Sequence, residues 1–395
     1  MRYSGPSGSS ARLPPMRVEQ RSWTPESGWS PAFQDGAVHE GVQLVLVFGS
    51  LDQVLGSGCL EVVRSQYPKA HVVGCTTAGQ IHGTQVSDNL VALTAIGFDH
   101  TRVALTQTRI EGVADSRAAG ERLARMLDPN GLRHVFVLSE GVKVNPSELV
   151  AGIDSALPSG VAVSGGCAGD GNRLQTTHVW GDGAPMQSAV VGIGFYGERL
   201  QVGVTAIGGW RPFGPARVIT RSEKNVVYEF DGRPALALYK RYLGKYAEDL
   251  PSSGMMFPLE LRADEAGRRV LRSPQSVDEA EQSITYAGNV PVGAQASFMF
   301  ATIGDLIEGT FAAAKNSVER FGTAPPQLSI LVSCNGRRYV LKQRTEEEVE
   351  AVHEALGQQS TLTGFYSYGE IAPAEGGGQS QLHNETMTIT WFAER

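Results

Sequence analysis

The N-terminal half of the chain contains the same arrangement twice: an apolar strand, a helix, and a second strand with a glycine inside it. The first copy reads QLVLVFGS, helix, HVVGCTTAG and NLVALTAIGF, and the second reads RHVFVLSEG, helix, GVAVSGGCAGD and SAVVGIGFYG. Gly49 and Gly74 are 25 positions apart, and Gly141 and Gly165 are 24 apart. A helix between two strands at this spacing has the size of a βαβ unit, whose strands are parallel. The repeat therefore predicts an α/β protein with mixed sheets.

Composition narrows the class of protein further. The 395 residues suffice for two domains, and 41% apolar residues suffice for substantial cores. The net charge is −7, from 34 Lys and Arg against 41 Asp and Glu. No basic run is interleaved with aromatic residues, so we expect no direct contact with nucleic acid.

The cysteines and the N-terminus bear on the compartment. Cys59, Cys75, Cys167 and Cys334 are widely spread without a CxxC pair, which argues against a disulfide framework and a zinc site. The N-terminal sequence MRYSGPSGSSARLPPM lacks the apolar region of a signal peptide, and no apolar run approaches about 18 residues. We therefore expect a cytoplasmic protein that does not insert into membranes.

Three segments differ in composition. Residues 1–40 are rich in Ser, Gly and Pro and are predicted to be a disordered lead. Residues 41–225 form a first domain with the duplicated βαβ-like units. Residues 226–395 form a smaller C-terminal α/β domain.

Polar side chains follow the apolar strands of the C-terminal segment. Two strands end in Ser333–Arg337 and Gly364–Glu370, and His383–Thr386 introduces a third. Such ends place polar groups and backbone amides at the rim of a sheet, where ligands usually bind. The GFYSYGE and LHNET sequences found here closely resemble the C-terminal half of FIST domains.

The resemblance to FIST domains covers most of the chain. Leu44–Ser50, Val72–Ile81 and Ser164–Asp170 resemble the N-terminal half of the family, and Asp231–Leu236 resembles the start of the C-terminal half. It implies a two-part FIST-like architecture, with a FIST N-like domain at 41–225 and a FIST C-like domain at 226–395. It also implies an intracellular sensor that binds a small molecule at the cleft between its halves. The signal would pass to a separate protein such as a histidine kinase or a cyclic-dinucleotide enzyme.

Two glycine motifs resemble catalytic or cofactor signatures without their context. Gly192–Gly197 fits GxGxxG, but a strand-like segment follows it instead of a helix, which favours a hairpin turn. Gly165–Gly169 fits the GxCxG form of a nucleophile elbow, but the following DGNRLQTTHVW has no helical period. A cysteine-dependent hydrolase stays an alternative, and the favoured expectation is a protein without catalytic activity.

The candidate ligand-binding residues share a position at or beside a strand end. They are Cys75, Thr76, Thr77, Gly79, Gly166, Cys167, Cys334, Asn335, Arg337, Tyr366, Tyr368, Glu370, His383 and Asn384. Arg337 suits a carboxylate or phosphate, or else an internal ion pair with Glu370. Cys334 is near Arg337 and Arg338, which favours a reactive thiolate, whereas a free cysteine is ordinarily a buried apolar residue.

A haem-binding nitric-oxide sensor is the second functional reading, because some FIST proteins resemble sensors of the NosP type. His178 and His383 each lie next to a predicted rim, and the histidines show no HExxH pattern. His178 is the favoured haem-iron ligand, because the TTHVW strand places Trp180 on the same face as His178. The cofactor itself is left open.

Overall fold

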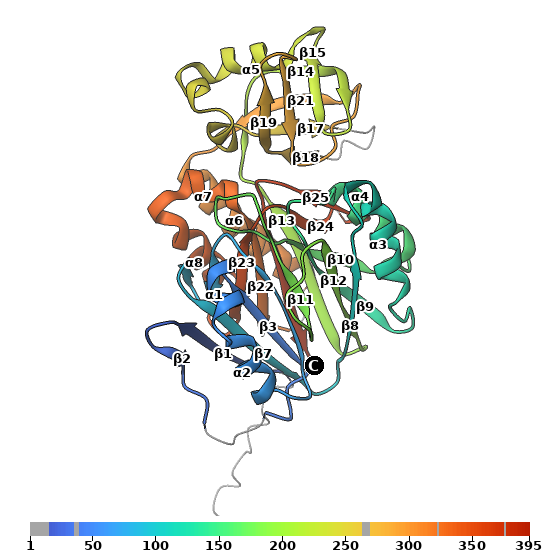
Figure 1. Ribbon diagram of the computed structural model, residues 1–395, viewed down its shortest axis with the longest axis vertical. Helices are drawn as coiled ribbons and strands as arrows, with labels where there is room; N and C mark the ends of the chain where they lie inside the picture. Colours follow the sequence, from blue (N-terminus) through green and yellow to red (C-terminus); the bar gives the residue numbers. More distant parts are fainter. Residues whose placement is uncertain (1–15, 35–38, 263–268, 322–323, 375–376) are drawn as a thin grey trace, which may run out of the picture.

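The computed structural model describes residues 16–34, 39–262, 269–321, 324–374 and 377–395. A larger body carries both ends of this described chain, and a smaller domain is inserted between β13 and α6 (Figure 1). The first fifteen residues of the expected disordered lead lie outside the description. For residues 16–34 that expectation is wrong, because Met16–Thr24 forms strand β1, which pairs with β7 from Met16↔Phe98 to Trp23↔Val91.

The body consists of three six-stranded mixed sheets. The first contains, in order, β11 (Val179–Gly181), β4 (His71–Thr76), β3 (Leu44–Gly49), β7 (Val91–Phe98), β1 and β2 (Gly28–Ser30). The second contains β25 (Ser380–His383), β24 (Glu370–Pro373), β10 (Ala162–Cys167), β9 (Leu132–Ser139), β12 (Ala189–Tyr196) and β8 (Arg102–Arg109). The third contains β13 (Leu200–Ile207), β26 (Met387–Glu394), β22 (Leu328–Cys334), β23 (Thr361–Ser367), β5 (Gln80–His82) and β6 (Gln85–Ser87).

Each sheet is built around a parallel pair with an antiparallel strand beside it. The pairs β3–β4 and β9–β10 confirm the two predicted units, and β22–β23 forms a third unit that the sequence analysis missed. The glycine in each second strand has a physical cause. A Cβ atom on Gly74, Gly165 or Gly364 would lie 1.8–1.9 Å from a carbonyl oxygen of the paired strand. The third unit escaped notice because its first strand ends in Ser333–Cys334, without the glycine that sets the spacing in the other two.

The three units exchange strands in a closed circle. β5 leaves the first unit to pair with β23, β24 leaves the third to pair with β10, and β11 leaves the second to pair with β4. Each sheet therefore contains a strand from another unit, and the body has approximate threefold symmetry. The GxGxxG segment forms the end of β12 and the first residue after it. β13 follows but lies in a different sheet, so the expected hairpin is wrong although a strand does follow.

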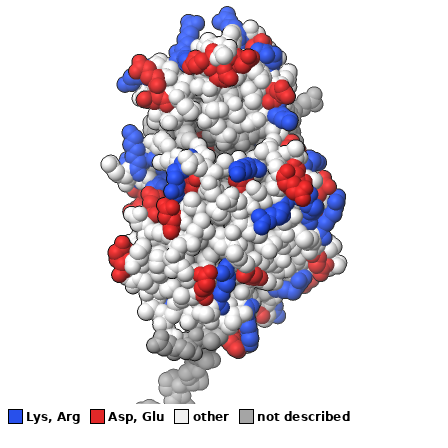
Figure 2. Space-filling view, in the orientation of Figure 1, with Lys and Arg blue, Asp and Glu red and all other residues white. Residues whose placement is uncertain are grey.

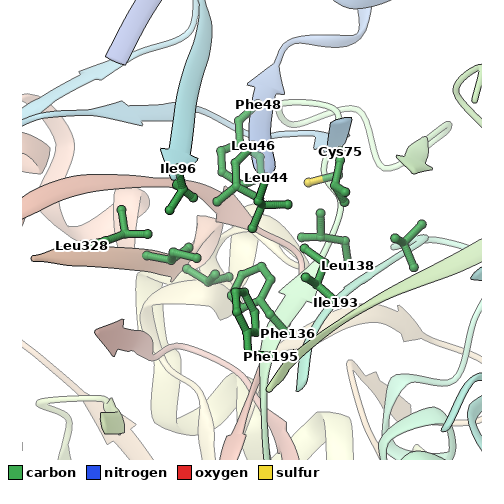
Figure 3. Close-up of a cluster of buried hydrophobic side chains, with 14 of the residues drawn as sticks. Leu44, Leu46, Phe48, Cys75, Ile96, Phe136, Leu138, Ile193, Phe195 and Leu328 are labelled. Atoms are coloured by element: carbon green, nitrogen blue, oxygen red, sulfur yellow. The ribbon is translucent and has the colours of Figure 1, made fainter. Parts of the chain in front are cut away.

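The body has an inner core and outer layers of helices. Leu44, Leu46 and Phe48 of β3 point inward to side chains of all three sheets (Figure 3), while Val45 and Val47 point outward. Strands buried on both faces explain the continuous apolar runs in the sequence. The helices on the outer faces are α1 (Leu51–Gly56), α2 (Cys59–Gln66), α3 (Ser116–Arg125), α4 (Pro146–Ala156), α6 (Ile303–Phe321) and α8 (Thr345–Leu356).

The smaller domain has its own curved sheet and core. Its strands are β14 (Arg211–Glu223), β15 (Val226–Phe230), β16 (Arg233–Pro234), β17 (Leu259–Arg262), β18 (Arg269–Arg272), β19 (Pro274–Asp278), β20 (Ser283–Tyr286) and β21 (Gln295–Phe300). Helix α5 (Ala235–Leu243) packs Leu236 and Tyr239 against Phe230 and Phe298. The predicted boundary at residue 225 falls between β14 and β15, inside this domain.

Short helices complete the secondary structure. α7 (Asn335–Leu341) follows β22 directly. The 3-10 helices are η1 (Val113–Asp115), η2 (Gly244–Asp249), η3 (Ser252–Met256) and η4 (Lys342–Arg344).

Candidate ligand site at the strand ends

Equivalent backbone hydrogen bonds bring the predicted strand ends together at one end of the body. Thr76 N donates to His178 O (2.9 Å), Cys167 N to Gly369 O (2.8 Å) and Tyr366 N to Gly79 O (2.8 Å). Each bond joins one unit to the strand that another unit contributes. Rim residues that are far apart in the sequence therefore meet around the approximate threefold axis.

The centre of this arrangement is filled with apolar side chains. Cys75 and Cys167 are fully buried, and the rings of Phe48 and Phe365 lie 4.8 Å apart. Burial raises the pKa of both thiols well above the ordinary cysteine value, so the nucleophilic thiolate is disfavoured. These two cysteines belong to the core, which corrects the expectation that they line a pocket.

The other predicted rim residues of the first two units also serve the fold. Thr76 Oγ1 accepts from His178 N (3.0 Å), and Thr77 is buried against Gln80. Gly79 has a φ of +139°, and its missing side chain leaves room for Arg338. A Cβ atom on Gly79 would lie 2.7 Å from Nη1 of Arg338. At Gly166 a Cβ would lie 2.6 Å from Val332. Close packing, and not ligand contact, explains these positions.

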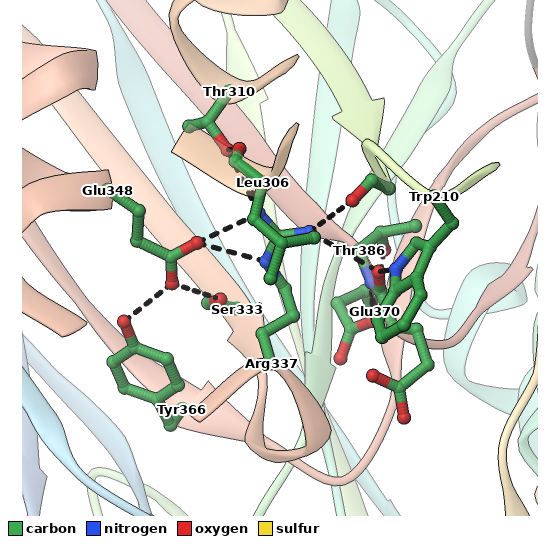
Figure 4. Close-up of polar contacts among 11 residues, drawn as sticks. Trp210, Leu306, Thr310, Ser333, Arg337, Glu348, Tyr366, Glu370 and Thr386 are labelled. Atoms are coloured by element: carbon green, nitrogen blue, oxygen red, sulfur yellow. Dashed lines mark hydrogen bonds and ion pairs between the residues drawn. The ribbon is translucent and has the colours of Figure 1, made fainter. Parts of the chain in front are cut away.

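Arg337 is an internal structural residue, and its partner differs from the expected one. Its Nε and Nη2 atoms lie 3.0 and 2.9 Å from Glu348 Oε2, and its Nη1 donates to Gly208 O (2.6 Å) (Figure 4). The Glu348 carboxylate also accepts from Tyr366 OH (2.7 Å). Arg337 and Glu348 are both 0% exposed, so no anion from solution reaches the guanidinium. The expected pair with Glu370 is wrong, because Arg337 belongs to α7 and meets Glu348 on the adjacent helix α8.

Two buried carboxyl groups lie beside Cys334. Glu370 accepts from Ser367 Oγ (2.6 Å) and Thr386 Oγ1 (3.0 Å), and burial raises the pKa of Glu370 to about 8. Burial also raises the pKa of Glu385 to about 7. The pKa of the Cys334 thiol is raised well above its usual range, by burial first and then by these carboxyl groups. The structure therefore disfavours the reactive thiolate considered for Cys334.

Tyr368 and Asn335 hold the loop that follows β10. Tyr368 OH donates to the Asp170 carboxylate and to Gly171 O (3.0 Å), and Asn335 Nδ2 donates to Gly171 O (3.3 Å). Residues 168–178, all of them described, form turns, bends and extended segments. The helix that a nucleophile elbow requires does not follow Cys167.

A cleft of about 1090 Å³ separates the body from the smaller domain. Trp210, Leu271 and Met299 line it from the small domain and the linker that leads into that domain. His383 and Thr386 line it from the body, and of the predicted ligand-binding residues only His383 borders the cleft. Trp210 is a lining residue that was not predicted, although the Gly208–Gly209–Trp210 break between two strand-like runs marks the crossing into the small domain.

The two candidate haem ligands differ in their surroundings. His383 is 6% exposed and its Nε2 has no hydrogen-bond partner among the described residues. Burial, reinforced by the charge of Arg272, lowers the pKa of His383 to about 4, so the ring is neutral at pH 7. His178 is also buried, but it does not line the cleft, and its Nε2 lies 3.3 Å from Gln187 Nε2. The cleft therefore favours His383 over His178 as the histidine that meets a ligand.

Glu385 connects this segment to the smaller domain. Ser273 Oγ donates to Glu385 Oε1 (2.6 Å), and Trp210 Nε1 donates to Glu385 O (2.7 Å). Arg272 Nη1 donates to Leu382 O (3.2 Å). The segment from Leu382 to Thr386 thus contributes His383 and Thr386 to the cleft lining and also holds the two parts of the molecule together.

Other features bear on partners. Positive and negative side chains are interspersed on the face shown in Figure 2, without a large patch of one sign. Among the described residues no helix is long and apolar enough to cross a membrane.

Comparison with known proteins identifies the family. The FIST N domain model matches residues 43–233 and the FIST C domain model matches residues 235–373. An uncharacterized protein of Mycobacterium tuberculosis (strain H37Rv) is 25% identical over 359 residues, covering 85% of this chain and 87% of its own length. An uncharacterized protein of Mycobacterium bovis is 28% identical over 260 residues, covering 63% and 65%. A crystal structure of a cyanuric acid hydrolase from A. caulinodans superposes with a TM-score of 0.39 at 8% identity, over 97% of this chain and 99% of that one. The chain belongs to the FIST domain family, whose domains sense small ligands in signalling.

Proposed function

We propose that this protein is a non-enzymatic, cytoplasmic sensor that binds a small polar metabolite, such as an amino acid, beside His383 in the interdomain cleft. The observation that carries the proposal is His383, which lines the cleft and whose buried Nε2 lacks a partner among the described residues. A buried polar atom without a partner costs free energy, which a ligand hydrogen bond would recover. A neutral imidazole serves as donor or acceptor.

The ligand signal would travel through the residues next to His383. Glu385 is two positions away and holds Ser273 and Trp210 of the small domain and its linker. A ligand that contacts His383 and Leu271 at once would favour one angle between the two parts over others. The signal then passes to a separate protein, for which we propose a histidine kinase or a cyclic-dinucleotide enzyme.

Native mass spectrometry of the purified protein tests this proposal, because it shows small molecules that stay bound. We expect His383→Ala to lower the affinity for a retained ligand about 2- to 10-fold, the effect of one neutral hydrogen bond. His178→Ala is the matched control, a buried histidine outside the cleft, and should leave the affinity unchanged. Equal affinities in wild type and His383→Ala would show that the ligand binds elsewhere.

Haem binding in the same cleft is the second candidate, and it too is favoured by the unpaired Nε2 of His383. The volume and the apolar residues Trp210, Leu271 and Met299 fit a porphyrin, whose iron would supply gas binding. His383 would then be the iron ligand in place of His178. Titration with haemin should give a Soret shift in wild type and His178→Ala but not in His383→Ala. A wild type without a shift would exclude haem and leave the first candidate intact.

A further inference from the structure

We propose that β13 is a docking edge for an extended segment of a partner protein, which joins the third sheet as an additional strand. This inference rests on the proposed function, because the separate signalling partner is the protein whose segment would bind here. In the described part of the chain β13 is the last strand of its sheet and pairs with β26 alone. An edge strand offers unpaired N–H and C=O groups to another chain.

The hydrogen-bond register shows which groups are offered. Arg395 N donates to Arg199 O (3.2 Å), which makes this a hydrogen-bonded pair next to Leu200↔Glu394. Because such pairs alternate in an antiparallel ladder, the amides of Val202, Val204 and Ala206 point away from β26. These three residues line the cleft. The cleft lining includes every residue from Val204 to Trp210. The edge of a strand exposes consecutive residues in this way, whereas one face of a sheet exposes only alternate residues.

The molecule already uses the equivalent edge of another sheet in this way. β1 holds the position in the first sheet that β13 holds in the third, beside the antiparallel strand of its unit. There β2 adds to the outer edge of β1, with Ser22 opposite Ser30 and Thr24 opposite Gly28. The geometry of the unit therefore accepts one more strand at this place.

The walls of the cleft indicate the chemistry of the partner segment. Leu157, Val161 and Pro373 also line the cleft and provide apolar contacts for side chains of a bound segment. Arg133 is exposed at the cleft and also lies near Leu200, and its guanidinium makes no hydrogen bond or ion pair with any described residue. The expected partner segment alternates apolar residues and carries an acidic residue for Arg133. A volume of about 1090 Å³ exceeds the roughly 300–1,000 Å³ of ordinary ligand pockets, so a small ligand at His383 leaves room for it.

Selection from a phage-displayed library of random 12-residue peptides tests the proposal on the full chain. Val204→Pro removes an amide that β26 does not use and fills the edge with the ring, so folding should persist. We expect selected peptides to bind wild type at least about tenfold more tightly than Val204→Pro. Val204→Ala, which loses only the side chain, should stay within about threefold, and Arg133→Ala should lose the preference for acidic residues.

Hydrogen exchange supplies the direct readout. Bound peptide should slow exchange at the amides of Val202, Val204 and Ala206. The proposal is overturned if no peptide prefers wild type over Val204→Pro, or if protection falls elsewhere. It is also overturned if the free protein already protects these amides from exchange. Loss of that protection on deletion of residues 1–15 would identify the N-terminus as the occupant, and loss on dilution would identify a second copy of the chain. The two proposals can fail separately. If a small ligand still binds Val204→Pro, the ligand site does not depend on the docking edge. If peptides bind while no small ligand is found, the docking edge stands without the ligand site.

Discussion

The first and third units have the same backbone pairing at their strand ends but differ in charge. Gln80 lies opposite Phe365 where β5 enters the third sheet, and Glu370 lies opposite Gly166 where β24 enters the second. The Gln80 side chain is hydrogen-bonded on both atoms when its oxygen accepts from Ser50 N (3.0 Å) and its nitrogen donates to Ser87 O (2.5 Å). Glu370 instead accepts from two hydroxyl groups, and the pKa of its carboxyl is raised to about 8.

The difference follows from what each strand end adjoins. Gln80 is enclosed by its own unit and carries no charge at any pH. Glu370 bonds Thr386, which borders the cleft and follows Glu385, the residue that contacts the small domain. A titratable group thus occupies this junction where it adjoins the cleft wall, while the first unit has a neutral residue at the same junction.

Deletion of residues 1–34 should have the largest effect on stability. It tests whether β1 supports its sheet as its counterparts in the other two units do. It removes β1, which holds the place of β8 and β13 in its sheet and pairs along its length with β7. Each large apolar side chain that loses its burial costs about 1.5–3 kcal/mol, so we expect the free energy of unfolding to fall by several kcal/mol. Deletion of residues 1–15 removes none of these contacts and serves as the control. Equal urea midpoints for the two deletions would show that β1 contributes little.

The sequence predicts the structure correctly where a pattern is local. The parallel pairs β3–β4 and β9–β10 follow from apolar runs at matched spacing, and the polar strand ends do meet. The strand exchange could not be read from the sequence, because β5, β11 and β24 are short and their partners lie in other units. A serine- and glycine-rich composition concealed β1, whose alternation carries few large apolar residues.

The candidate site was harder to predict, since partner choice depends on helix placement. The sequence left two roles open for Arg337 at the end of β22, a ligand contact or an ion pair with Glu370, but α7 turns it toward Glu348 on α8. The cleft itself needs the inserted small domain, which contributes Leu271 and Met299 to its wall. His383 was found because the LHNET sequence signals a strand end, which is local information.

Arg337→Ala tests the charged network beneath the third unit. Removal of the guanidinium leaves Glu348 buried at 0% exposure without its cation, and loss of one partner of a buried pair costs about 3–5 kcal/mol. Arg338→Ala is the matched control, because its partner Asp88 is 59% exposed and such pairs contribute about 0–1 kcal/mol. Urea unfolding measures both, and similar losses would refute the distinction. Ligand affinity should be unchanged in any Arg337 variant that folds.

Glu370→Gln gives the third unit the neutral residue of the first and should flatten the dependence of stability on pH. The pKa of the Glu370 carboxyl is about 8 in the folded state and near 4.5 in the unfolded state. Between these two pH values the folded carboxyl keeps its proton and the unfolded one has lost it. The unfolded state therefore binds fewer protons in this window, and the free energy of unfolding falls as pH rises, by up to about 1.4 kcal/mol per unit. We expect wild type to lose about 2–4 kcal/mol from pH 5 to 8, and the variant to lose less.

The reciprocal change, Gln80→Glu, is the control for that experiment. It places a carboxyl group against Ser87 O, where ionisation is unfavourable, and should introduce pH dependence into the first unit. Parallel pH profiles for wild type and Glu370→Gln would show that another group, such as Glu385, causes the dependence.

Ser273→Ala carries the smallest expected effect and tests whether the third unit's strand end controls the small domain. The variant removes the donor to Glu385 Oε1 and leaves that oxygen unpaired, which should cost about 1–2 kcal/mol. Because the lost bond joins the two parts, faster hydrogen exchange should appear at Trp210 and in the residues around Leu271, and small-angle scattering should show a wider spread of domain positions. Ser222→Ala, which removes a bond of equal length to Val290 O inside the small domain, should lower stability without either change. Equal changes in hydrogen exchange and scattering for both variants would show that the contact with Glu385 does not specifically hold the two domains together. The strand ends of the first and third units would then differ only in charge.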